Sequence, residues 1–305
     1  MKKILLIFSF IFLLTSNSYA FEKGCSEVYS YLVFDYKTSN IISENRSDRL
    51  AYPASLVKLM TLYLTFEAIE QGKLNPEQVL KISQRGEEIS KVNKVNRLAI
   101  KEGDEITVRE AIRAVIVKSF NEAAVTLAEA VSGDEWQFAH KMNDKASELG
   151  MINTSFRNAS GLHEEGQYTT SYDLARLVIA MQKKFPGYYH LFSVKEFEYR
   201  GTKYETHNRV LLDYKGAEGM KTGFTNAAGF NLISAAKKGD HRVISVLLGC
   251  ATAPRRDEFT KELLNKAFAK LEDHPDSFFV KVSKGFNYTS KHEERYEEEM
   301  NFGMR

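Results

Sequence analysis

The chain has 305 residues, of which 43% are hydrophobic and 12% aromatic, so it can bury a substantial core and is not globally disordered. Its 42 basic and 40 acidic residues nearly balance. This balance argues against a general nucleic-acid or anionic-membrane binder, because such proteins usually carry a basic patch.

The first twenty residues have the pattern of an export signal. Lys2 and Lys3 precede an apolar segment, Ile4 to Leu14, that is too short to span a bilayer comfortably. The segment Ser18-Tyr19-Ala20 resembles a cleavage site, which predicts a cut after Ala20; an uncleaved N-terminal anchor is the alternative. Cleavage leaves 40 basic and 40 acidic residues. No later stretch is apolar and long enough to span a membrane, so we expect an exported, soluble protein.

Two short strands and a buried helix come next. Alternating β-branched and aromatic residues predict strands at Ser26 to Tyr36 and Ile41 to Glu44. The helix from Ser55 to Gly72 is hydrophobic almost all round, which is typical of a core helix. A narrow polar stripe interrupts it, formed by Ser55, Lys58, Thr61 and Thr65.

The middle of the chain is mainly helical by its apolar spacing and caps. The segment from Asn75 to Ser90 looks helical near its start, with Pro76 in the first turn. We expect further helices at Thr107 to Lys118, Asn121 to Gly133, Asp134 to Leu149 and Tyr172 to Lys183. Thr107 and Glu110 have the spacing of a capping box.

Strands return after residue 195. A small hairpin is expected at 196–206, followed by strands at 217–223, 229–237 and 241–249 and a helix at 255–271. Strands at both chain ends with helices between them predict the α+β class, with an antiparallel five-stranded sheet and an inserted, mainly helical block. We expect one domain at 21–272. A charged, partly disordered tail is expected at 273–305, with a possible strand at 278–282.

Ser55 and Lys58 lie three residues apart and therefore share a helix face. A lysine on an apolar helix is costly to bury without a partner, so Lys58 either extends to the surface or lies beside Ser55 to take its proton. The spacing alone leaves both interpretations open.

Two further motifs carry polar groups suited to chemistry. Ser119-Phe120-Asn121 lies at a helix junction, although Ser119 with Glu122 also fits a capping box. Lys221-Thr222-Gly223 ends a predicted strand, where the cation and hydroxyl suit a carboxylate and the glycine lets a ligand approach the backbone. The alternative is an ordinary turn with a solvated lysine.

Each motif is weak alone, because the same patterns recur at Ser234–Lys237 and Ser43–Asn45. Their order is more specific: Ser119 follows Ser55 by 64 positions, and Lys221 follows Ser119 by 102. The arrangement resembles the penicillin-recognising serine enzymes, and within them the D-alanyl-D-alanine carboxypeptidases. Further similar segments are Ala51 to Lys58, Asn158 to Leu162, Tyr168 to Thr170 and Gly219 to Phe230, so the resemblance covers roughly 27–270. It implies a β-lactamase/transpeptidase-like fold.

Three positions depart from the family pattern. Glu122 stands where Asp is frequent, Phe120 where a small residue is usual, and Glu218 where Asp is common. These changes keep charge or lie beside the motif atoms, so they bear on substrate preference more than on the reaction.

The resemblance implies catalytic roles for three residues. Ser55 would attack the penultimate D-Ala carbonyl and form an acyl-enzyme. Lys58 would be the base, kept neutral by burial and by the nearby charge of Lys221. Ser119 would relay a proton to the leaving D-Ala amine.

The remaining motif residues would bind substrate. Asn121 would hold the peptide backbone, and Lys221, Thr222 and Gly223 would receive the terminal carboxylate. The N–H groups of Ser55 and Phe224 would form an oxyanion hole.

The resemblance implies no cofactor and no metal. The partners would be peptidoglycan stem peptides ending in D-Ala-D-Ala and β-lactams as covalent inhibitors, in the periplasm and associated with the cell wall. The tail shows no apolar stripe for a strong membrane anchor. Because the family's first strand lies antiparallel to its last, Cys25 and Cys250 would lie near each other, and a disulfide between them is one possibility; two buried thiols are the other.

Three other functions compete with this one. A glutamate-dependent β-lactamase on the same fold would have an E-x-x-L-N segment, which is absent between Asn121 and Lys221. A metal-dependent D,D-carboxypeptidase would need clustered ligands, whereas the seven histidines are scattered. A non-catalytic peptidoglycan-binding homologue would not need Ser55, Lys58 and Lys221 intact.

Overall fold

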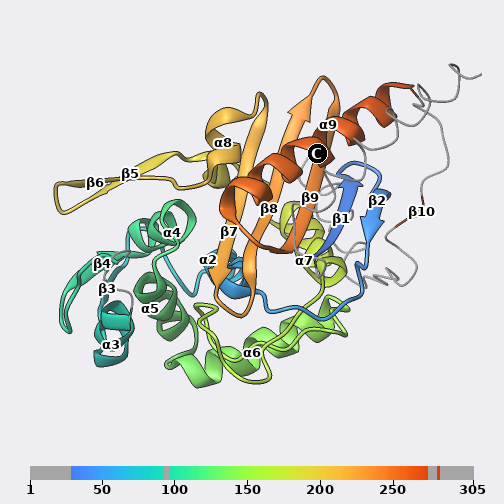
Figure 1. Ribbon diagram of the computed structural model, residues 1–305. Helices are drawn as coiled ribbons and strands as arrows, with labels where there is room; N and C mark the ends of the chain where they lie inside the picture. Colours follow the sequence, from blue (N-terminus) through green and yellow to red (C-terminus); the bar gives the residue numbers. More distant parts are fainter. Residues whose placement is uncertain (1–28, 93–96, 274–279, 282–305) are drawn as a thin grey trace, which may run out of the picture.

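An antiparallel sheet, whose strands are not in chain order, forms the centre of the molecule (Figure 1). The computed structural model describes residues 29–92, 97–273 and 280–281. Within them the sheet has six strands in the order β10-β2-β1-β9-β8-β7. Their bounds are β1 Ser30–Asp35, β2 Asn40–Asn45, β7 Ala217–Thr225, β8 Gly229–Lys238, β9 His241–Cys250 and β10 Val280–Lys281.

The predicted meeting of the two chain ends is confirmed. Strand β1 lies antiparallel to β9, with Ser30 opposite Leu248 and Asp35 opposite Val243. The five predicted strands are all present, and the two-residue β10 adds a sixth at the edge beside β2. Part of the predicted strand at 278–282 lies outside the described residues.

Helices cover both faces of the sheet. In β1, Leu32 and Phe34 contribute to the larger core on one face, whereas Val33 contributes to the smaller core on the other. This follows from the two-residue period of a strand. Helix α9 (Ala253–Asp273) packs against β8 and β9 over the smaller core, and α7 (Ser171–Lys184) packs on β1 and β9 from the other side.

The inserted helical block surrounds one central helix. A short 3₁₀ turn, η1 (Ala54–Val57), leads into α2 (Lys58–Glu70), whose residues 58–66 are all buried. It contacts α5 (Asn121–Ser132) and α6 (Glu135–Glu148), and α5 in turn packs against α3 (Gln84–Val92) and α4 (Val108–Val117). The predicted capping box of Thr107 and Glu110 at the start of α4 is confirmed.

The prediction of a helix from Asn75 is wrong at its start. The Asn75 side chain accepts a hydrogen bond from the Glu77 N–H at 2.9 Å, which forms a local turn and not a helix cap. A strand follows, β3 (Val79–Lys81), with only Leu80 buried, and it pairs with β4 (Glu105–Thr107). Helix α3 begins at Gln84.

A second hairpin extends away from the sheet beside α4 (Figure 1). Strands β5 (Glu196–Tyr199) and β6 (Thr202–Glu205) pair as predicted. Besides β3 and β4, two helical elements were not predicted, η2 (Pro186–Ser193) and α8 (Arg209–Asp213). None of the helices in the described part of the chain combines the length and apolarity needed to cross a membrane.

Candidate active site

Lys58 is the centre of a buried polar cluster. Its Nζ donates to Ser55 Oγ at 3.0 Å, to Asn121 Oδ1 at 2.7 Å and to the Ser160 carbonyl. The side chain is completely buried, so it does not extend to the surface. The one-turn spacing brings Lys58 to Ser55, whereas Asn121 and Ser160 arrive from α5 and from the 158–164 loop.

Burial controls the charge of Lys58. Desolvation lowers the pKa of Lys58 to about 7, while the carboxylates of Glu122 and Glu135 act against this shift. Burial is therefore a cause, as predicted. The second predicted cause, the charge of Lys221, does not contribute to the shift in the pKa of Lys58. Repulsion between the two lysines instead affects Lys221: burial, and after it the charge of Lys58, lowers the pKa of Lys221 well below its usual range.

A second lysine–serine pair joins strand β7 to the residue two positions before α5. Lys221 Nζ donates to Ser119 Oγ at 2.7 Å and to the Thr222 carbonyl at 2.9 Å. Lys221 is only 1% exposed, which contradicts the solvated turn that its sequence also allowed. The Ser119 hydroxyl is thus held by the side-chain nitrogen of a lysine 102 positions away in the chain.

The capping-box interpretation of Ser119 is wrong. The N-cap of α5 is Phe120, and no side chain caps that helix. Glu122 instead is buried and accepts a hydrogen bond from the Leu98 N–H, and burial raises the pKa of its carboxyl. Ser119 has φ 62°, a left-handed conformation that costs a serine energy and is typical of functional sites.

The departure at Phe120 has a packing explanation. Its ring is 1% exposed and contacts two rings of the β5–β6 hairpin, Tyr204 at 5.3 Å and Phe197 at 6.4 Å between centroids. A small residue at this position would leave the hairpin without this contact. The hairpin therefore packs directly against the segment that carries Ser119 and Asn121.

Strand β7 lies close against the segment before Ser55. A Cβ on Gly223 would lie 3.2 Å from the Pro53 carbonyl oxygen and 3.2 Å from the Ser55 nitrogen. We expected this glycine to admit a ligand; its nearest neighbour is the backbone of residues 53–56. The next residue, Phe224, is 49% exposed and stacks on Phe230 at 4.3 Å.

Asn231 is a buried site residue that the sequence reasoning missed. From β8 it donates to the carbonyls of Tyr52 and Pro53 at 3.0 and 3.1 Å, and its oxygen accepts from the Gly249 N–H at 2.8 Å. It thereby ties the turn before Ser55 to two strands. A buried amide inside an otherwise apolar strand was the available signal.

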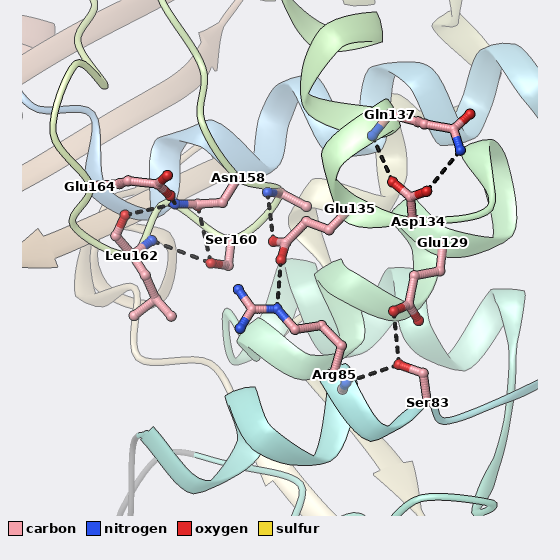
Figure 2. A network of polar contacts seen from close by, with 12 residues as sticks. Ser83, Arg85, Glu129, Asp134, Glu135, Gln137, Asn158, Ser160, Leu162 and Glu164 are labelled. Atoms are coloured by element: carbon pink, nitrogen blue, oxygen red, sulfur yellow. Dashed lines mark hydrogen bonds and ion pairs between the residues drawn. The ribbon is translucent and has the colours of Figure 1, made fainter.

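The 158–164 loop supplies the carbonyl that contacts Lys58, and its own side chains organise it (Figure 2). Asn158 accepts from Ser160 Oγ and the Gly161 N–H at 3.2 and 2.7 Å, and donates to the Leu162 carbonyl and to Glu164 at 3.0 Å each.

Glu135 anchors this loop to the helical block. It accepts from the Ala159 N–H at 3.1 Å and pairs with Arg85 at 2.9 Å, as Figure 2 shows. The loop that positions Ser160 is therefore fixed from two sides.

Gly161 fills a position that only glycine fits. Its φ is +78°, and a Cβ there would lie 2.0 Å from the Ala54 carbonyl oxygen, beside Ser55. Ala54 itself is buried and has a left-handed φ of 49°.

We expect Gly161→Ala to lower the free energy of unfolding by about 2–4 kcal/mol, because backbone strain and a steric clash add. Gly103 is a matched control, since its φ is +82° and nothing lies within 4 Å of its Cβ position. Gly103→Ala should cost only about 1–2 kcal/mol. Urea unfolding of both variants tests this, and equal losses would contradict the clash.

Thr61 and Thr65 have structural roles only. Thr61 Oγ1 donates to the Ala159 carbonyl at 2.7 Å, and Thr65 Oγ1 donates to the Thr61 carbonyl at 2.8 Å. Both therefore support the helix and the loop below the site.

Cys250 lies at the end of β9, completely buried and disulfide-bonded. Its predicted partner, Cys25, lies outside the described residues, so the pairing of these two cysteines stays a prediction.

The arrangement suits acyl transfer. Two serine hydroxyls each contact a buried lysine, and the Asn121 amide joins the first pair. A hydroxyl beside an amine of pKa about 7 is an activated nucleophile near neutral pH. In the described part of the chain, no group of three or more His, Cys, Asp or Glu side chains is arranged to hold a metal ion.

Comparisons with known proteins agree with this geometry. A family model described as D-alanyl-D-alanine carboxypeptidase matches residues 21–252. DacF of Bacillus subtilis, a D-alanyl-D-alanine carboxypeptidase, is 35% identical over 279 residues, covering 87% of this chain and 70% of DacF. Other curated relatives are matched over as little as 61% of their own length.

Two solved structures show the same fold. Penicillin-binding protein 6B of Escherichia coli is 35% identical, with a TM-score of 0.72 over 78% of this chain and 76% of that one. Penicillin-binding protein D2 of Listeria monocytogenes, in its ampicillin-bound form, is 31% identical, with a TM-score of 0.70 over 78% of this chain and 96% of that one. The predicted fold class is confirmed.

Proposed function

The chain belongs to the D-alanyl-D-alanine carboxypeptidase family, and from that premise we propose that it is a serine-type carboxypeptidase that removes the terminal D-alanine from peptidoglycan stem peptides, with Ser55 as nucleophile. The observation that carries this proposal is the contact of Ser55 Oγ with the buried amine of Lys58. The roles of the individual site residues belong to the same proposal.

Acylation begins with neutral Lys58. Its Nζ takes the proton of Ser55 Oγ while that oxygen bonds to the carbonyl carbon of the penultimate D-Ala. The carbon–nitrogen bond to the terminal D-Ala then breaks, and the departing amine receives a proton through Ser119. Water attacks the acyl-enzyme next, which releases the shortened peptide and returns the proton to Ser55.

The other site residues hold the substrate. Asn121 binds its backbone, and Lys221 and Thr222 bind its terminal carboxylate. Burial disfavours the charged form of Lys221, so an arriving carboxylate stabilises the ammonium that binds it. The N–H groups of Ser55 and Phe224 stabilise the oxyanion; the close approach of Gly223 to the Ser55 nitrogen supports this assignment.

Product analysis tests the function directly. The purified protein is incubated with a peptide ending in D-Ala-D-Ala, and released D-alanine is measured with and without penicillin pretreatment. We expect release of one D-alanine for each peptide, and its loss after pretreatment. Intact peptide, or release that penicillin does not affect, would overturn the proposal.

The cellular setting follows from the same proposal. We place the peptidase in residues 21–272, exported after cleavage of the signal at 1–20, in the periplasm and associated with the cell wall. Its substrates are stem peptides of peptidoglycan, and β-lactams are its covalent inhibitors. Cell fractionation with an antibody to the protein checks this location.

A further inference from the structure

His207 contacts the carboxylate-binding strand of the site but takes no part in the proposed acylation and deacylation steps. It lies in the loop between β6 and α8, and its Nε2 is 2.7 Å from Thr222 Oγ1 on β7. Thr222 is only 5% exposed. No motif in the sequence pointed to His207, because its partner lies 15 positions away on another element.

The loop that carries His207 is held on both sides. Thr206 Oγ1 accepts from the Asn208 N–H at 3.2 Å, and Asn208 Oδ1 accepts from the Leu211 N–H at 3.3 Å, which caps α8. On the other side the β5–β6 hairpin packs on Phe120. The backbone on both sides of His207 is therefore held by other contacts, and these contacts place the imidazole beside Thr222.

His207 stays neutral at working pH. Desolvation by the surrounding protein lowers the pKa of His207 to about 3, and the positive charges of Lys221, Lys118, Arg256 and Lys58 add to this shift. A neutral imidazole has one donor and one acceptor nitrogen, so its tautomer decides what Thr222 can do.

The threonine hydroxyl has one proton to give. If Nε2 lacks a proton, it takes the hydroxyl proton, and Oγ1 then presents only lone pairs to an anion. If Nε2 carries the proton, it donates to Oγ1, and the hydroxyl proton is free to point at a carboxylate. Only the second arrangement lets Thr222 bind an anion.

We propose that His207 is a positioning residue whose Nε2–H donates to Thr222 Oγ1 and so directs the hydroxyl proton toward the terminal carboxylate of the substrate. This inference rests on the proposed function, because it assumes that Thr222 receives that carboxylate. It makes His207 a determinant of selectivity for substrates with a free C-terminus.

The kinetic test compares two substrates, a D-Ala-D-Ala peptide and the same peptide ending in a carboxamide. The readout is the kcat/KM for the acid divided by the kcat/KM for the carboxamide. His207→Ala should lower this ratio about tenfold, mainly by raising KM for the acid, because one hydrogen bond to a charged group is lost. His207→Gln should keep most of the ratio, since its amide nitrogen can donate to the same oxygen. Equal losses for acid and amide would overturn the proposal.

Two further variants separate positioning from a structural effect. In a Thr222→Val background, His207→Ala should change the ratio little, because the group it acts through is gone. His190, whose ring Nδ1 lies 2.8 Å from the Gly187 carbonyl oxygen, is a matched exposed histidine, and His190→Ala should leave the ratio unchanged. An undiminished effect of His207→Ala in the Thr222→Val background would overturn the proposal.

The tautomer gives a readout that does not depend on activity. Long-range ¹H–¹⁵N spectra of the wild-type protein, assigned by the signal lost in His207→Gln, should show protonated Nε2 and unprotonated Nδ1. The reverse pattern would overturn the proposal even if the enzyme is active. Absence of turnover by the wild-type protein would overturn the proposed function itself, whereas turnover with an unchanged ratio in His207→Ala would overturn only the role of His207.

Discussion

Ser55→Ala is expected to abolish covalent labelling by fluorescent penicillin and to lower D-alanine release by at least about 10⁴-fold, because the hydroxyl that forms the acyl-enzyme is removed. Ser55 is partly exposed and loses only its contact with Lys58, so the variant should fold. Gel fluorescence after incubation with the label measures the first effect, and D-alanine release measures the second.

The chain contains its own control for this experiment. Ser234 belongs to a second S-x-x-K sequence but lies in β8, where its hydroxyl donates to the Gly219 carbonyl at 3.2 Å. Ser234→Ala should keep its covalent label. Retained labelling of Ser55→Ala would show that another residue is the nucleophile and would overturn the assignment.

Lys58→Met is expected to slow acylation by about 10²–10⁴-fold, the usual loss when a general base is removed. Methionine fills a similar volume but cannot accept a proton. In the wild-type protein, kcat/KM should rise with pH through a pKa of about 7, because only neutral Lys58 is a base and protonation below that pH removes it. Stopped-flow labelling between pH 5 and 9 measures both effects.

Glu122→Gln tests the electrostatic origin of this profile. Its carboxylate favours the charged form of Lys58, so its removal should lower the pKa of Lys58 and move the acid limb to lower pH. If the acid limb of the pH profile has the same midpoint in Glu122→Gln as in the wild type, Glu122 does not act on Lys58. A wild-type rate that falls with rising pH through 7 would contradict neutral Lys58 as the base.

Misread segments show where local sequence misleads. Asn75 and Pro76 look like a helix start, yet the Asn75 side chain closes a turn and Leu80 is buried in strand β3, which pairs with the distant β4. Ser119 and Glu122 have the spacing of a capping box, yet each binds a partner from another element. In both cases tertiary contacts outweighed a local preference worth about 1 kcal/mol.

Local periodicity determined much of this protein from its sequence. The helical period joins Ser55 to Lys58, and the two-residue period of the strands separates the two faces of the sheet. The tertiary structure decided what these residues meet. Asn121 and the Ser160 carbonyl reach Lys58 from 63 and 102 positions away, and His207 reaches Thr222 from another element. Such contacts depend on how distant segments pack, and complete burial of Lys58, which lowers its pKa, exists only after that packing.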